Sequence, residues 1–172
     1  MRLVWIALLA LQAASVQPGS PSNSSQQPHG AHGVRNEQYG LFLRPRDASN
    51  QDGEPIVLYA LQPWKCMAWH FEDTPGGTRL VNFFTGKSFE VRGAASEKAL
   101  VQMPSSSERQ GSESFHFVPL EHGLFEITSG GGEALTAVDI DGHGDIRVVV
   151  SPWKNQASQR WQLVDIPDHF TM

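Results

Sequence analysis

The sequence has little cysteine, no excess of positive charge and only one long apolar run. One of its 172 residues is cysteine, which excludes an internal disulfide framework and a zinc site built from several thiolates. Lysine and arginine number 13 against 18 acidic residues, giving a formal net charge of −5. Because an acidic chain does not attract phosphate backbones, we expect no nucleic-acid binding. The composition, with 16 glycines, 11 prolines and 40% apolar residues, excludes a coiled coil, a collagen-like chain and a wholly disordered chain.

The apolar run lies at the N-terminus. Leu3–Leu11 is uninterrupted, follows the basic Arg2, and is followed by small residues up to Ser15. This order is typical of a secretory signal peptide cleaved after Ser15, and the run is too short to span a bilayer. We therefore expect residues 1–15 to be a signal peptide and the mature protein to be secreted and extracellular, with no membrane insertion.

The next segment, residues 16–33, is rich in Pro, Ser, Gly and Gln, and only Val16 and Ala31 in it are apolar. Such a stretch buries too little surface to offset its chain entropy, so it is predicted to be a disordered spacer. His29 and His32 have no third ligand nearby in the sequence, and we expect no metal or other cofactor here.

Residues 34–168 repeat three times. Trp69, Phe115 and Trp161 are each 46 residues apart, and other like residues follow the same step: Gly40, Gly86 and Gly132; Leu43, Phe89 and Leu135; Phe71, Phe117 and Leu163; Val57, Met103 and Val149. The three units are 34–78, 79–124 and 125–168. Each alternates apolar and polar residues with turn signals between, and a unit of this length holds about four strands. The sequence predicts an all-β domain of twelve strands.

The third unit ends on Gln159-Arg160-Trp161, where the first has Met67-Ala68-Trp69 and the second Glu113-Ser114-Phe115. A three-fold, four-strand repeat closing on Gln-x-Trp resembles the ricin B-type (R-type lectin) β-trefoil family. The resemblance implies a β-trefoil, and it implies that the repeated positions form its structural core: Leu43, Trp69, Phe71, Phe89, Phe115, Phe117, Leu135, Gln159, Trp161 and Leu163.

The resemblance also implies where a sugar would bind. In the family a carboxylate near the start of each repeat accepts hydrogen bonds from sugar hydroxyls, an aromatic ring stacks on the sugar, and an amide completes the site. The three positions hold Arg44, Tyr59 and Cys66 in the first unit; Glu90, Ser105 and Ser112 in the second; and Thr136, Ser151 and Ser158 in the third. No unit has the full set, so we expect degenerate sugar sites.

Two further features are candidates for binding. Pro63-Trp64-Lys65 recurs as Pro152-Trp153-Lys154, and each Trp either stacks on a ligand ring or caps the barrel mouth. The acidic run from Asp139 to Asp145 resembles the start of a calcium loop, but Val150 stands where a calcium loop needs Glu, which favours a hairpin turn. The candidate ligand-binding residues are Tyr59, Trp64, Glu90, Asp139, Asp141 and Trp153.

The first functional hypothesis is a secreted carbohydrate-binding, lectin-like module that binds glycans or glycoproteins. The alternative is an interaction protein, protease-inhibitor-like or effector-like, that keeps the trefoil scaffold, has lost sugar binding and binds a protein partner. Because no set of acid, base and nucleophile stands out, we expect no enzyme activity. We expect a monomer, and Cys66 to be either a reactive thiol or a buried small hydrophobe.

Overall fold

The computed structural model describes residues 31–94, 98–106, 110–139 and 144–167. Twelve strands occur in three groups of four. The first group is β1 (Ala31–Asn36), β2 (Phe42–Pro45), β3 (Ile56–Tyr59) and β4 (Trp69–Thr74). The second is β5 (Gly77–Asn82), β6 (Ser88–Arg92), β7 (Ala99–Met103) and β8 (Phe115–Pro119). The third is β9 (Leu124–Ser129), β10 (Ala134–Asp139), β11 (Ile146–Ser151) and β12 (Arg160–Asp165).

Helical structure in the described residues is confined to single turns. One turn of α-helix, α1 (Gln110–Glu113), precedes β8. Short 3₁₀ turns cover Arg46–Ala48, Lys65–Met67, Glu121–Gly123 and Ala157–Gln159. Within the same ranges, no helix is long and apolar enough to cross a membrane.

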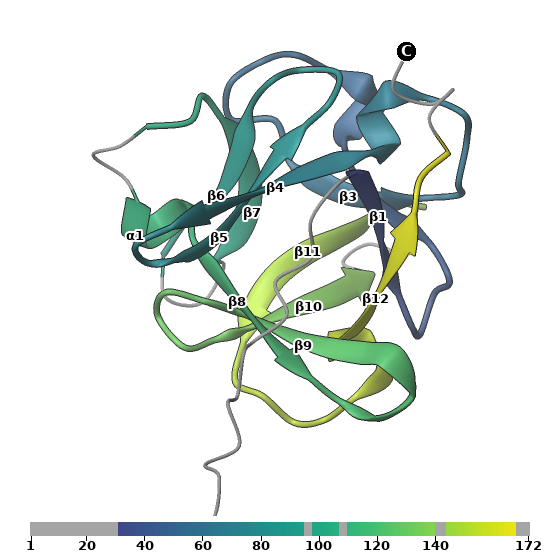
Figure 1. Ribbon diagram of the computed structural model, residues 1–172, viewed down its shortest axis with the longest axis vertical. Helices are drawn as coiled ribbons and strands as arrows, with labels where there is room; N and C mark the ends of the chain where they lie inside the picture. The colour runs from purple at the N-terminus through teal and green to yellow at the C-terminus, as the bar shows by residue number, and fades with distance from the viewer. Residues whose placement is uncertain (1–30, 95–97, 107–109, 140–143, 168–172) are drawn as a thin grey trace, which may run out of the picture.

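Six strands close into a barrel. The antiparallel pairs run β1–β4–β5–β8–β9–β12, and β12 returns to β1, so each strand of this ring has two neighbours. Figure 1 shows the closure, with the purple β1 beside the yellow β12. A closed ring leaves no barrel strand with an unpaired edge.

The other six strands form three hairpins, β2–β3, β6–β7 and β10–β11. They meet one another through β11, which pairs with both β3 and β7. A six-stranded barrel capped by three hairpins is the β-trefoil fold, as the resemblance implied.

Each unit enters its hairpin through a tight turn that ends in glycine. Gly40, Gly86 and Gly132 have φ of 68°, 66° and 77°, a region that side chains disfavour. The amide nitrogen of each donates to a carbonyl three or four residues earlier, over 2.8 to 2.9 Å. The backbone conformation therefore explains why glycine recurs at the 46-residue step.

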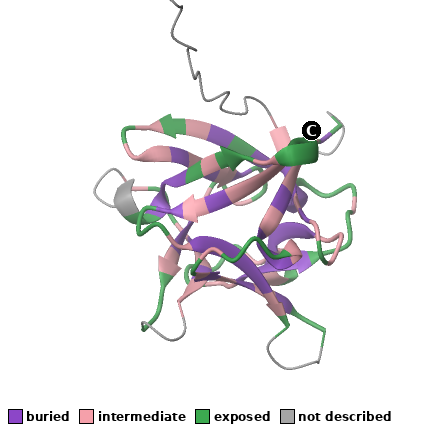
Figure 2. Ribbon diagram, turned by 90° about the horizontal axis from the view of Figure 1, so that it is seen from below, coloured by how far each residue is buried: buried purple, intermediate pink, exposed green. Residues whose placement is uncertain are grey.

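The core lies inside the barrel and under the hairpins, where buried residues line the strands in Figure 2. Trp69, Phe115 and Trp161 are fully buried. The indole Nε1 of Trp69 donates to the Leu43 carbonyl over 3.1 Å, and that of Trp161 donates to the Leu135 carbonyl over 3.0 Å. Of the ten predicted core residues, Phe117 and Leu163 are partly buried and the others are buried.

The first strand begins earlier than the sequence indicated. Residues 31–33 were expected to belong to the spacer, but they lie in β1, where Ala31 pairs with His70 and Gly33 with Val164. Backbone pairing on both sides holds these residues although their side chains are small or polar. The rest of the spacer and the expected signal peptide lie outside the described residues.

Candidate functional site

The first unit carries an aromatic cluster at the positions where the resemblance puts a sugar site. The guanidinium carbon of Arg44 lies 3.9 Å from the centre of the Tyr59 ring, in a cation–π contact. Tyr59 is also stacked with Trp64, at 6.1 Å between ring centres and 24° between planes. Tyr59 is 41% exposed and Trp64 is 44% exposed, so the stacked pair presents aromatic surface to solvent. We call Arg44, Tyr59 and Trp64 the aromatic platform.

The strand register explains this cluster. Phe42 pairs with Tyr59 and Arg44 pairs with Val57 across the β2–β3 hairpin. Alternate residues share a face, so Arg44 and Tyr59 are diagonal neighbours on the outer face. Trp64 follows in the loop after β3, directly before the short turn that contains Cys66.

Cys66, at the first unit's amide position, is buried and free. Burial raises the pKa of the Cys66 thiol, although the nearby charge of Arg44 and a hydrogen bond from it act in the opposite direction. A thiol with a raised pKa is a poor nucleophile, which favours the interpretation of Cys66 as a buried small hydrophobe.

In the second unit, the residues expected to contact a sugar already have protein partners. Glu90 is buried, is paired with Arg92, and accepts a hydrogen bond of 3.4 Å from Ser112 Oγ. A shallow pocket of about 300 Å³ opens beside Ser112, and an ion pair of 2.6 Å between Lys98 and Glu133 lies on its wall. The carboxylate that the resemblance assigns to a sugar is therefore already held by neighbours.

In the third unit the site positions form a closed polar network. Thr136 Oγ1 and Ser151 Oγ lie 2.7 Å apart. Gln159 Nε2 donates to both oxygens, over 3.2 and 3.1 Å, and to the Pro152 carbonyl over 2.9 Å. The glutamine of the Gln-x-Trp motif thus fastens the hairpin to the last strand, a structural role.

The remaining candidates in the third unit are dispersed. Trp153 is half-buried, unlike the exposed Trp64. Asp139 is exposed at the end of β10 and pairs with Ile146 across the hairpin, so the acidic run connects two antiparallel strands. Asp141 lies outside the described residues. No group of three or more His, Cys, Asp or Glu side chains that could hold a metal occurs in the ranges described.

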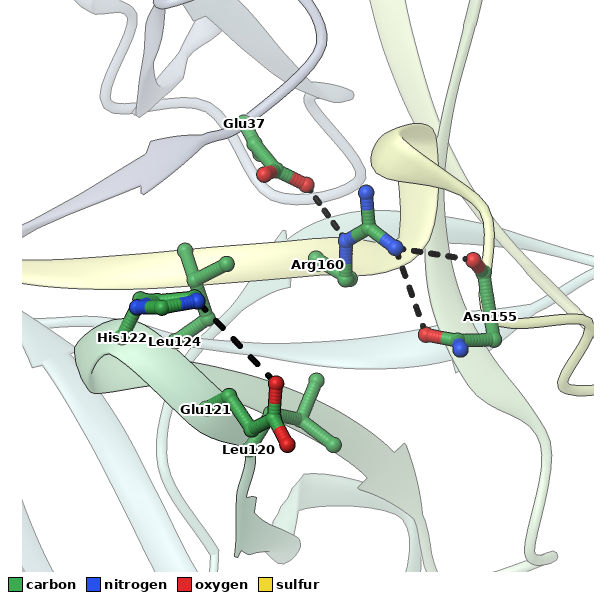
Figure 3. A pocket seen from close by; sticks show the side chains of 7 residues that line it. All are labelled: Glu37, Leu120, Glu121, His122, Leu124, Asn155 and Arg160. Carbon is green, nitrogen blue, oxygen red and sulfur yellow. Dashed lines mark hydrogen bonds and ion pairs between the residues drawn. The ribbon is translucent and has the colours of Figure 1, made fainter.

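A second shallow pocket of about 300 Å³ lies between the β8–β9 turn and the start of β12 (Figure 3). Its lining residues are Glu37, Leu120, Glu121, His122, Leu124, Asn155 and Arg160. Arg160 is ion-paired with Glu37, and its Nη1 donates to the Asn155 carbonyl over 3.0 Å. Because its cation already has partners, this pocket offers a ligand less than the aromatic platform does.

Sequence reasoning selected Tyr59 and Trp64 but did not include Arg44 in the site, nor Arg147. The signal for Arg44 was present, since it occupies the carboxylate position of the resemblance. Arg147 is placed by the pairing of β11 with β3, in which it lies opposite Val57. That pairing joins residues distant in sequence, and no local pattern indicates it.

Comparisons with known proteins support the fold. No protein-family model and no curated protein sequence matches the chain. Among solved structures, the designed three-fold symmetric protein ThreeFoil matches with a TM-score of 0.71 at 22% identity, over 78% of this chain and 98% of that one. The Rhizoctonia solani agglutinin matches with a TM-score of 0.69 at 16% identity, over 81% and 97%. A Culex salivary protein of the Cysteine and Tryptophan-Rich family matches with a TM-score of 0.67 at 16% identity, over 82% and 96%.

Proposed function

We propose that this β-trefoil is a carbohydrate-binding, lectin-like module of the R-type, and that it acts outside the cell by binding rather than by catalysis. The observation that carries the proposal is the exposed, stacked pair of Tyr59 and Trp64 at the position where the resemblance puts the sugar-stacking ring. Aromatic rings of this kind pack against the apolar face of a sugar. One neighbour of the same fold is an agglutinin, which is consistent with the proposal.

The three units differ in what they offer a sugar. The first has exposed rings, the second has a carboxylate that is already bonded, and the third has hydroxyl and amide groups bonded to one another. We therefore infer one working site for each chain, in the first unit. A shallow site with one ring surface and few polar groups binds a monosaccharide weakly.

A glycan array tests the proposal. The chain is screened as the wild type, as Tyr59→Ala and as Trp64→Ala. Trp153→Ala is the matched control, because it changes the same residue type in the same Pro-Trp-Lys motif in a unit without exposed rings. We expect both first-unit variants to lose binding and the control to keep it. Absence of binding to every glycan would overturn the proposal.

The alternative, a protein-binding trefoil, also has an observation in its favour. Most of the exposed large apolar side chains of the described residues fall between residues 59 and 84: Tyr59, Leu61, Trp64, Phe83 and Phe84. The Phe83 amide donates to the Ala68 carbonyl over 3.0 Å, which brings the two segments that carry these side chains together. Contiguous exposed apolar residues mark interaction surfaces. A partner captured on this surface and not displaced by any sugar would favour this alternative, and Phe84→Ala, which leaves the platform intact, would weaken the capture.

A further inference from the structure

We propose that the ligand of the first-unit site is an acidic sugar, a ring that carries a carboxylate or a sulfate, and that Arg44 and Arg147 bind its negative group. This inference rests on the proposed function and deepens it. It starts from a substitution in charge: where the resemblance expects a carboxylate, this chain has an arginine.

Arg44 is a buried cation without a matching anion. It is 7% exposed, and its Nε makes no hydrogen bond. No carboxylate is paired with it in the described part of the chain; its neighbours are the Tyr59 ring and the Cys66 thiol. Buried charges in proteins are normally paired, because an unpaired one keeps its desolvation penalty. A ligand anion would supply the missing partner.

Arg147 lies on the same face. Val57 of β3 pairs with Arg44 on one side and with Arg147 on the other, so the three residues form one row across β2, β3 and β11. Adjacent strands are about 4.8 Å apart, which puts the two arginine Cα atoms about 10 Å apart. The Arg147 Nε is also buried without an acceptor. Two arginines whose Nε groups lack partners therefore flank one buried valine beside the aromatic platform.

Other charged groups lie near this row. Arg46 is also nearby, and its Nε is paired with Asp145 over 3.0 Å. Lys65 is exposed next to Trp64, and Asp139 lies on β10, one residue beyond the partner of Arg147. Among the described residues, Asp47 follows Arg46 and Glu54 lies three residues before Val57, so charges of both signs are near the row.

Hydrogen-bond chemistry points to the same ligand. A carboxylate accepts hydrogen bonds from sugar hydroxyls, whereas a guanidinium only donates. A neutral sugar at Arg44 can offer only uncharged acceptors, such as hydroxyl, ring and N-acetyl oxygens. A carboxylate or sulfate oxygen forms shorter and stronger charge-assisted bonds with a guanidinium. An arginine at the position of the family's carboxylate therefore disfavours a neutral sugar and favours an acidic one.

The experiment compares three classes of glycan on one array: neutral, ending in a uronic or sialic acid, and sulfated. The wild type is screened with Arg44→Gln and Arg147→Gln, and Lys154→Gln, which removes an exposed positive charge from the third unit, serves as the control. Thermal melting of each variant checks that it is folded. We expect acidic glycans to bind at least tenfold more tightly than neutral ones, since a hydrogen bond to a charged group contributes about this factor or more. Arg44→Gln and Arg147→Gln should each remove most of that preference, and the control should keep it.

The outcomes separate the two proposals. A shared preference for carboxylate and sulfate, or for either alone, that weakens as salt is raised supports the inference and identifies the group. Equal binding of neutral and acidic glycans that is lost in Tyr59→Ala overturns the acidic-sugar inference and leaves the lectin proposal intact. A preference for acidic glycans that both arginine variants keep overturns the assignment to this row. Absence of all glycan binding overturns both proposals.

Discussion

The buried ring of each unit and the hairpin residue at the position of Leu43 lie in one hydrophobic core, and a double-mutant cycle tests whether the two side chains compete for space. The pairs are Trp69 with Leu43, Phe115 with Phe89, and Trp161 with Leu135. The first and third units pair a Trp with a Leu, whereas the second pairs two rings, with 4.9 Å between the centres of Phe89 and Phe115. Phe89 also contacts the Trp69 ring, at 5.2 Å between centres. The cycle uses Trp161→Phe, Leu135→Phe and both together.

The magnitudes follow from the contacts. Trp161→Phe removes the 3.0 Å hydrogen bond to the buried Leu135 carbonyl, at about 1–3 kcal/mol, and leaves a cavity that adds about 1–2 kcal/mol. Leu135→Phe alone overfills the site and costs about 1–3 kcal/mol. In the double variant the added ring fills the cavity, so only the hydrogen-bond loss should remain, about 1–3 kcal/mol.

Urea unfolding followed by far-UV circular dichroism measures the free energy of unfolding for all four proteins. We expect the double variant to be at least about 1 kcal/mol more stable than the sum of the single effects implies. Additive effects, equal within about 0.5 kcal/mol, would refute the reasoning, because the two side chains would then not compete for one space.

Three other predictions concern single groups. Because burial raises the pKa of the Cys66 thiol, a disulfide reagent at pH 8 should label the native protein far more slowly than the urea-unfolded protein; equal rates would show an open thiol. Desolvation raises the pKa of Glu126, so protonation of this carboxyl stabilises the folded state, and that stabilisation is lost as pH rises through the raised pKa. Glu126→Gln should therefore raise the urea midpoint at pH 7 and raise it less at pH 4. An equal gain at both pH values would contradict this. Asn82 donates to the Cys66 carbonyl over 2.9 Å and accepts from the amides of Phe84 and Thr85. Asn82→Ala should therefore lower the free energy of unfolding by about 2–4 kcal/mol, measured with denaturant. A decrease below about 0.5 kcal/mol would show that water replaces the side chain.

The fold could be predicted because its determinants repeat in the sequence. The turn glycines and the buried rings recur at one spacing, and each has a local reason, a positive φ or a fully buried position. Asn36 and Asn82 follow the same step and bond equivalent loops, over 3.0 and 2.9 Å, and this signal was missed. Their repetition reflects backbone groups that need the same partner in the first two units; the third has Thr128 at this step.

The site was less predictable because its parts come together through non-local pairing. Tyr59 and Trp64 could be selected as exposed rings beside turns. Glu90 was also selected, but its carboxylate is taken up by Arg92 and Ser112, which only the packing of α1 beside β6 reveals. The row of Arg44, Val57 and Arg147 depends on the register of β11 against β3. Hydrophobic patterning assigns the face of each strand but not which distant strand lies beside it.

The closure of the barrel by β1 and β12 has a consequence for engineering. His32 pairs with Asp165 and Asn36 with Trp161, so the first and last strands run antiparallel along their full length. A short linker could therefore join them, and new ends could be opened at the exposed turn around Pro75, without removing any of the twelve strands. Such a circular permutant would move the cut from one junction between units to the next, and its refolding would show whether the three junctions are interchangeable.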